Sequence, residues 1–235
     1  MTMTLLSRDW RSIEAELDAD GVSVLPGLLA PGRCDALAAL YDGAGESAFR
    51  STVVMARHGF GSGEYKYFAY PLPEGLESLR SALYTSLVPT ANRWSAALGS
   101  AQRFPESHAD YLQRCHAAGQ TRATPLLLRY GPGDYNCLHQ DLYGDHVFPL
   151  QVVVLLSAPG CDFDGGEFVL VEQRPRRQSR AIVVPLAKGD AAVFAVSQRP
   201  VQGARGAYRV ILRHGVSRIR RGTRTTLGLI FHDAA

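Results

Sequence analysis

Short β-branched runs separated by glycine turns fill the second half of the chain, and this pattern most strongly limits the fold. The turns at residues 131–133 (Gly-Pro-Gly), 164–166 (Asp-Gly-Gly) and 188–190 (Lys-Gly-Asp) have the residues that reverse a chain between strands. Runs at this spacing are typical of an antiparallel barrel or sandwich, so we predict an eight-stranded jelly roll. The expected strands are 126–130, 135–141, 151–157, 167–172, 180–186, 190–196, 208–214 and 224–232.

The first 120 residues have mostly helical periodicity. We expect helices at 7–18, 31–41, 75–98 and 104–118, with strands at 21–25, 51–57 and 65–70. Pro89 is expected to kink or break the third helix. The predicted protein is therefore mainly β with N-terminal helices (α+β), in which a helical and mixed region, 1–120, packs on a jelly-roll core, 121–235, to give one compact domain.

Composition excludes several classes of protein. The chain has 235 residues, of which 46% are hydrophobic and 20% charged, as in ordinary globular proteins. Its apolar runs are far shorter than the roughly 20 residues of a membrane span. Arg8, Asp9 and Arg11 interrupt the start before a signal-peptide apolar region can develop. We therefore expect a cytoplasmic protein without a membrane partner, and the sequence sets no oligomeric state.

Positive charge is concentrated toward the C-terminus. The formal net charge is only +3, but 13 basic residues and one acid lie between Gln173 and Arg224. The arginines at 174, 176, 177, 180, 218, 220 and 221 could contact phosphates, with the aromatic residues Tyr65, Tyr67, Phe68 and Tyr70 stacking on bases. The alternative is that these arginines form a solvated face and the aromatics belong to the core.

Two His-x-Asp triplets are candidate metal-ligand pairs. Residues 108–110 (His-Ala-Asp) fall in an expected helix, where positions two apart point to nearly opposite faces, so we predict that they lie at the surface. His139 and Asp141 fall in an expected strand, where residues two apart project from one face about 7 Å apart. This second pair could bind one metal ion, or both residues could be ordinary polar strand residues.

A site with two histidines and one carboxylate needs another histidine from a second strand. His146, His214 and His232 follow Asp141, and His214 is best placed because it ends the expected strand 208–214 and the next expected strand starts ten residues later, at Arg224. Such a ligand set leaves three positions of an octahedral ion open, as in non-haem Fe(II) oxygenases. The alternative is that His214 and His232 are partly buried histidines bonded to backbone groups.

The spacing of His139, Asp141, His214 and Arg224 resembles that of Fe(II)/2-oxoglutarate-dependent oxygenases. The resemblance implies a double-stranded β-helix in which the first three residues bind Fe(II) and Arg224 binds the far carboxylate of 2-oxoglutarate. A guanidinium suits this role because its planar fork binds a carboxylate bidentately. Thr226 matches the Arg-x-Ser/Thr pattern of that superfamily, which implies that its hydroxyl binds the same carboxylate.

Two further segments resemble different branches of the superfamily. Tyr130, followed by Gly-Pro-Gly and the metal-ligand triplet, is similar to AlkB-type nucleic-acid demethylases, which implies that Tyr130 contacts 2-oxoglutarate. Leu128 departs from that pattern, because those enzymes usually have Asn there. The segments 165–167, 188–190 and 214–224 resemble prolyl 4-hydroxylases, in which a single Arg follows the distal His by ten residues.

The whole chain is similar to a bacterial family of 2-oxoglutarate oxygenases of damaged nucleic acid, with residues 138–144 (Leu-His-Gln-Asp-Leu-Tyr-Gly) as its hallmark segment. Gln140, Asn136 and Tyr143 flank the predicted ligands and could support them or contact substrate. Ordinary strand and turn polar residues are the alternative for these three.

The resemblance implies a dioxygenase that uses Fe(II), 2-oxoglutarate and O₂, with ascorbate as an assisting reductant. It would hydroxylate or oxidatively demethylate its substrate, with methylated nucleic acid as the first candidate. A prolyl 4-hydroxylase-like hydroxylase of a protein side chain or small molecule is the alternative. A cupin-like metal-binding protein without turnover is a third hypothesis, and Arg224 argues against it because the residue has no role there without 2-oxoglutarate.

Overall fold

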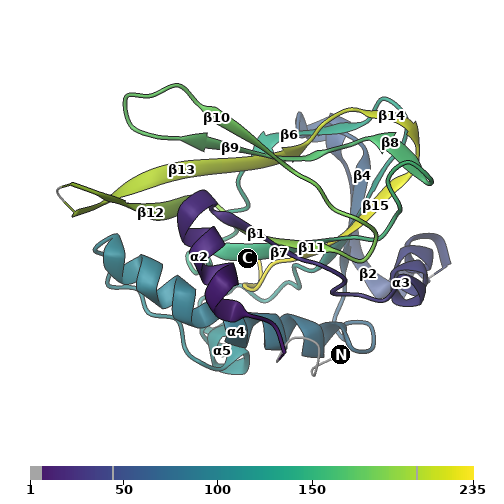
Figure 1. The fold of residues 1–235 in the computed structure, drawn as a ribbon. Coiled ribbons are helices and arrows are strands. Elements are labelled where there is room, and N and C mark those ends of the chain that lie inside the picture. Colours follow the sequence, from purple (N-terminus) through teal and green to yellow (C-terminus); the bar gives the residue numbers. More distant parts are fainter. Residues whose placement is uncertain (1–6, 44, 205) are drawn as a thin grey trace.

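Two antiparallel β-sheets face each other at the centre of the computed structural model, which describes residues 7–43, 45–204 and 206–235 (Figure 1). The major sheet has seven strands. Its order is β1 (Val22–Leu25), β11 (Ala191–Ala195), β7 (Leu150–Leu155), β15 (Arg224–Leu229), β5 (Leu126–Tyr130), β4 (Glu64–Phe68) and β2 (Phe49–Val54). β15 lies between β7 and β5 and is buried along its whole length.

The minor sheet carries the longest strand, β13 (Gly206–Val216), between β9 (Phe168–Gln173) and β6 (Tyr135–His139). Its outer strands are β10 (Arg180–Val184) and the short β3 (Gly61–Ser62), and β12 (Gln198–Gly203) pairs with the first half of β13. A separate two-stranded sheet joins β14 (Ile219–Gly222) to β8 (Phe163–Gly165). The predicted jelly-roll core is therefore confirmed, and β3, β8, β12 and β14 are strands that the sequence did not predict.

Two of the helices, α4 (Leu76–Ala97) and α5 (His108–Ala117), lie on the side of the major sheet away from the minor sheet (Figure 1). α4 packs beside α5, while α2 (Trp10–Asp20) lies beside β1, and α3 (Pro31–Gly43) follows β1 in the chain. Two 3₁₀ turns, η1 (Glu46–Ala48) and η2 (Met55–His58), flank β2. No helix in the described ranges is both long and apolar enough to cross a membrane.

Local chemistry explains where the helices begin and end. α2 starts at Trp10 rather than at residue 7 because the Asp9 carboxylate accepts a hydrogen bond from the Ser12 amide, as an N-cap does. α2 ends where Gly21 adopts a left-handed φ of 75°. The break expected at Pro89 is not seen: α4 continues through Pro89 because buried residues on both sides, from Leu79 to Trp94, hold it on the core.

Candidate metal and cosubstrate site

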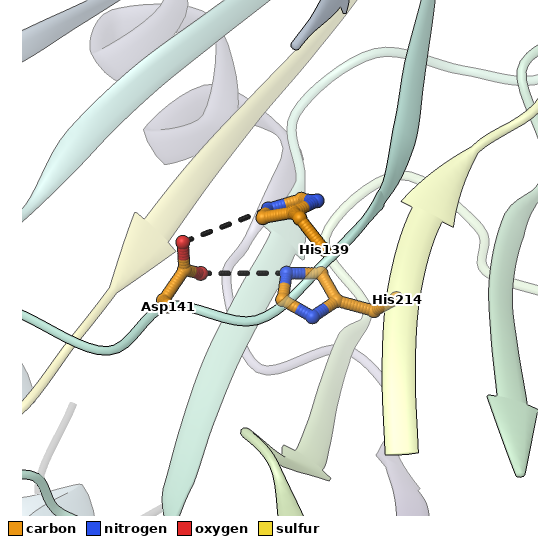
Figure 2. A group of neighbouring side chains, drawn as sticks. All are labelled: His139, Asp141 and His214. Carbon is orange, nitrogen blue, oxygen red and sulfur yellow. Dashed lines mark ion pairs between the residues drawn. The ribbon is translucent and has the colours of Figure 1, made fainter. Parts of the chain in front are cut away.

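Two neighbouring strands of the minor sheet bring the predicted histidines together. His139, at the end of β6, is directly opposite His214 of β13, and their rings are 4.2 Å apart between centroids. Asp141 lies two residues beyond the end of β6, so the loop, rather than the strand alternation that we predicted, directs its carboxylate toward the two rings. Figure 2 shows Asp141 facing both imidazoles, with 3.6 Å from Oδ1 to His139 Nε2 and 3.4 Å from Oδ2 to His214 Nε2.

The donor set of these three residues fits a divalent metal. One ligand atom from each lies within 4.8 Å of the others, and two imidazoles with one carboxylate form the set used by non-haem Fe(II) oxygenases. The His139 Nδ1 is 2.8 Å from the Cys137 carbonyl oxygen, which can only accept a hydrogen bond. His139 therefore carries its proton on Nδ1, and the lone pair of Nε2 is left for a metal.

Protonation of the site also favours metal binding. Burial, followed by the nearby His139, lowers the pKa of His214, so this imidazole is neutral near pH 7. Burial opposes ionisation of Asp141, but the hydrogen bonds and charges around it, His214 foremost, hold the pKa of its carboxyl well below the usual range. The site thus presents a neutral imidazole at His214 and an ionised carboxylate at Asp141, the forms that bind metal ions.

Asp141 accepts one further hydrogen bond on each oxygen. The Tyr143 hydroxyl donates to Oδ1 at 2.7 Å, and the Gln151 amide donates to Oδ2 at 2.8 Å. Tyr143 was among the predicted flanking residues, but Gln151 was missed. Its signal in the sequence is that it is the one polar residue in the apolar run 150–156, which forms the fully buried strand β7.

Arg224 is buried on the same cavity as the metal-binding candidates. Its side chain is 2% exposed, forms no ion pair with any described residue, and leaves Nε without a hydrogen-bond partner. Burial lowers the pKa of this guanidinium to about 10. An unpaired buried cation is costly, so the residue fits a ligand that brings its own carboxylate, as 2-oxoglutarate does.

Two predicted neighbours accompany Arg224. Tyr130 of β5 lies opposite Arg224 of β15, with the guanidinium carbon 5.7 Å from the ring centroid. Thr226 lies two residues further along β15 and is also buried. Tyr130, Thr226 and Arg224 line one wall of the cavity that His139 and Asp141 also reach.

This cavity has a volume of about 200 Å³ and is mostly apolar and aromatic. Apart from the metal-binding candidates and Arg224, no charged side chain of the described residues lines it. Asn136 donates a hydrogen bond to the Tyr130 hydroxyl, whereas the Gln140 amide donates to the Leu212 carbonyl oxygen and to Ser197. Its aromatic lining consists of Phe60, Tyr65, Tyr67, Tyr130, Tyr143, Phe168 and Phe194.

The remaining histidines lie outside the site. The prediction that His108 lies at the surface is wrong: it is 4% exposed, with Nε2 bonded to the Phe231 carbonyl oxygen and Nδ1 to the Ser81 hydroxyl. It forms a buried stripe along α5 together with residues three and seven positions later, a spacing that the sequence already shows. His232 is buried with Nδ1 accepting from the Phe148 amide, and His146 is not part of the metal-binding group.

Many of the predicted phosphate-binding groups already have partners in the fold. Tyr65 and Tyr67 reach the cavity, but Phe68 belongs to the main core and Tyr70 is hydrogen-bonded to Asp233. Of the seven arginines considered, four form ion pairs with acids of the chain. These pairs are Arg174 with Glu172, Arg180 with Asp20 and Glu172, Arg220 with Glu167, and Arg221 with Asp164.

A protein-family comparison places this site in context. The model of the Oxygenase-NA family, described as "Oxygenase, catalysing oxidative methylation of damaged DNA", matches residues 63–234. This chain belongs to that family. The oxygenase is also similar to two uncharacterized proteins of Mycobacterium tuberculosis, from strains CDC 1551 / Oshkosh and ATCC 25618 / H37Rv, each 54% identical over 168 residues, which cover 72% of this chain and 72% of the relative.

Solved structures share the fold of the oxygenase. A prolyl-4-hydroxylase from Pseudomonas putida superposes with a TM-score of 0.56 at 16% identity, covering 96% of this chain and 99% of the other. A 2-oxoglutarate-Fe(II) oxygenase family oxidoreductase from Burkholderia pseudomallei has a TM-score of 0.54 at 18% identity, covering 97% and 94%. Family and fold together make the protein a dioxygenase with Fe(II) as cofactor and 2-oxoglutarate and O₂ as cosubstrates.

Proposed function

We propose that His139, Asp141 and His214 bind Fe(II), that Arg224 with Thr226 and Tyr130 binds 2-oxoglutarate, and that the substrate is a methylated nucleic acid. The observation that carries this assignment is the buried guanidinium of Arg224, which has no carboxylate partner within the described chain and shares a cavity with the metal-binding group. A passive metal-binding protein would have no use for such a cation.

Different residues of the chain bind the metal ion and the cosubstrate. When bound, Fe(II) would activate O₂ and 2-oxoglutarate would supply two of the electrons that this activation needs, so that a C–H bond of the substrate could be oxidised. Arg224 fixes the far carboxylate of 2-oxoglutarate through a charge-assisted pair, and the Thr226 hydroxyl adds a neutral hydrogen bond to it. Asp141 and His214 are 7% and 6% exposed. The apolar walls around these two residues exclude water from the reacting groups.

The substrate proposal rests on the family description and on the lining of the cavity. A nucleobase that is modified on its edge has to leave the base stack, or to come from a single strand, and is then held by stacking on aromatic rings. Tyr65 and Tyr67 offer such rings: their centroids are 5.4 Å apart at an interplanar angle of 85°. Apart from the metal-binding candidates and Arg224, the described residues that line the cavity are uncharged, which suits a planar, largely apolar nucleobase.

Hydroxylation of a protein side chain or a small molecule is the second candidate. The observation that favours it is the pairing of Arg174, Arg180, Arg220 and Arg221 with acids of the chain, which removes much of the positive charge that a polyanion would use. A peptide or metabolite would need only the apolar cavity.

The test is to incubate the protein with Fe(II), 2-oxoglutarate, ascorbate and methylated single-stranded DNA, double-stranded DNA or RNA, and to measure nucleosides and succinate by mass spectrometry. We expect loss of a methyl mark with matching succinate, and neither product from Asp141→Ala or Arg224→Ala. Succinate formation with all nucleic acids unchanged, together with a new hydroxyl on a peptide or metabolite of a cell extract, would replace the first candidate with the second.

A further inference from the structure

The carboxylate of Asp141 needs an external support. It follows the end of β6, so no strand hydrogen bond fixes the backbone that carries it. Its two oxygens face two different imidazoles, and a rotation about the side-chain bonds would turn them away. The hydrogen bonds from Tyr143 to Oδ1 and from Gln151 to Oδ2 oppose this rotation, because each oxygen has its own donor.

Gln151 is placed at a cost to stability. It is the second residue of the buried strand β7, lies opposite Phe194 of β11, and is 7% exposed. Its Oε1 has no hydrogen-bond partner within the described chain. A buried amide oxygen without a partner is unfavourable by about 1–3 kcal/mol. An apolar residue would serve the fold better, so the amide serves the metal-binding group: its Nε2 donates to Asp141 Oδ2 at 2.8 Å and lies 3.4 Å from His214 Nε2.

Tyr143 is oriented by a second tyrosine. The Tyr67 hydroxyl, 3.2 Å away, donates to the Tyr143 hydroxyl. Because a phenol has one proton, accepting from Tyr67 leaves Tyr143 free to donate its own proton to Asp141. Tyr67 lies on β4, is 7% exposed, and carries the Arg50 guanidinium over its ring at 4.3 Å. A chain of contacts thus runs from the N-terminal strands to the metal-binding group.

We propose that Tyr143 and Gln151 are positioning residues that together hold the two oxygens of Asp141 for metal binding, and that Tyr67 directs the Tyr143 hydroxyl. The inference rests on the proposed role of Asp141 as a ligand. Each carboxylate oxygen keeps a second lone pair after accepting one hydrogen bond, so the hydrogen bonds from Tyr143 and Gln151 leave Asp141 able to bind the ion. Outer partners of this kind typically change metal affinity 10–100-fold.

The experiment measures Co(II) binding by calorimetry and the visible spectrum of the Co(II) protein, both without turnover. The variants are Tyr143→Phe, Gln151→Met and Tyr67→Phe, and the controls are Tyr135→Phe and Gln198→Met, whose polar side-chain atoms bond to no described residue. We expect Tyr143→Phe and Gln151→Met each to weaken Co(II) binding 10–100-fold and to alter the spectrum, while the controls match the wild type. Thermal unfolding of the metal-free proteins checks that all are folded.

A double variant tests the Tyr67 link. Tyr67→Phe should weaken Co(II) binding several-fold in the wild type but not in the Tyr143→Phe background, because its effect passes through the Tyr143 hydroxyl. If the folded Tyr143→Phe and Gln151→Met variants kept the Co(II) affinity and the spectrum of the wild type, the proposal that these residues position Asp141 would be overturned. An equal effect of Tyr67→Phe in both backgrounds would overturn the link. Failure of the wild type itself to bind Co(II) would instead refute the metal role of Asp141.

Discussion

Replacing Arg224 by Met should stabilise the cofactor-free protein while abolishing its response to 2-oxoglutarate. Burial lowers the pKa of Arg224 from 12.5 to about 10. At about 1.36 kcal/mol per pKa unit, the unpaired charge costs the folded protein about 3 kcal/mol. Met keeps an unbranched apolar side chain at this position without the charge. Loss of the contact with the Tyr130 ring offsets part of the gain, so we expect stabilisation by about 1–3 kcal/mol.

Thermal unfolding measures both halves of this prediction. For a chain of this size, each kcal/mol raises the melting temperature by about 2–4 °C. Wild-type protein with Mn(II) should gain about 2.7 kcal/mol when 2-oxoglutarate is present at 100 times its Kd, and Arg224→Met should gain nothing.

The matched control is Arg199→Met, because Arg199 is also buried but has a buried partner in Glu172. Arg174 and Arg180 still pair with Glu172 after this change, but the hydrogen bonds of Arg199 to Glu172 and to the carbonyl oxygens of Asp18 and Ala19 are lost, so Arg199→Met should destabilise by about 1–3 kcal/mol. The opposite signs at two equally buried arginines distinguish charge pairing from packing. If Arg224→Met proved less stable than the wild type, or still gained stability from 2-oxoglutarate, the reasoning would be refuted.

Three further predictions concern other parts of the fold. His108 is buried with its pKa lowered to about 4; the unfolded chain, with a pKa near 6.5, binds more protons, so stability is complete above pH 6.5 and falls by about 3 kcal/mol as the pH approaches 4. Urea unfolding should show this slope, and His108→Gln should reduce it to the part that His232 contributes, since burial lowers the pKa of His232 to about 4 as well. Gly166→Ala should raise the Kd for 2-oxoglutarate and leave the affinity for Mn(II) unchanged. Gly166 has a φ of +63°, and a Cβ there would lie 2.8 Å from Arg224 Cδ and displace the guanidinium. A variant that binds 2-oxoglutarate as tightly as the wild type would contradict this prediction. Gly144→Ala should destabilise by about 2 kcal/mol in urea unfolding, since its φ is +90° and the new Cβ would meet the Gln120 side chain at 2.5 Å; wild-type stability would count against this.

The parts of the site that the sequence predicts are those fixed by short spacing. His139 and Asp141 are two residues apart, and Arg224 follows His214 by ten, so the sequence alone is enough to group these residues. Gln151 could not be grouped with them, because its contact with Asp141 depends on the path of the loop 140–149, which brings β7 next to the carboxylate.

The fold shows the same division. Strands with strong apolar patterns, such as β5 and β11, were predicted to within a residue at each end. β12 contains Pro200 and β14 is rich in arginine, so both lack the apolar alternation that marks a strand. Pairing with a neighbour, rather than local preference, makes them strands. The helix through Pro89 persists for a related reason: packing on the core outweighs one lost backbone hydrogen bond.

The central place of β15 in the major sheet has a consequence for biosynthesis. β15 is the last of these strands in the sequence, yet it joins β7 to β5, so β5, β4 and β2 have no connection to the rest of the sheet until residues 224–229 leave the ribosome. Two unpaired apolar edges remain open during that time, and such edges promote aggregation. Nascent chains should therefore depend on chaperones until synthesis reaches β15, and Arg224 enters the cavity in the same late step that closes the sheet.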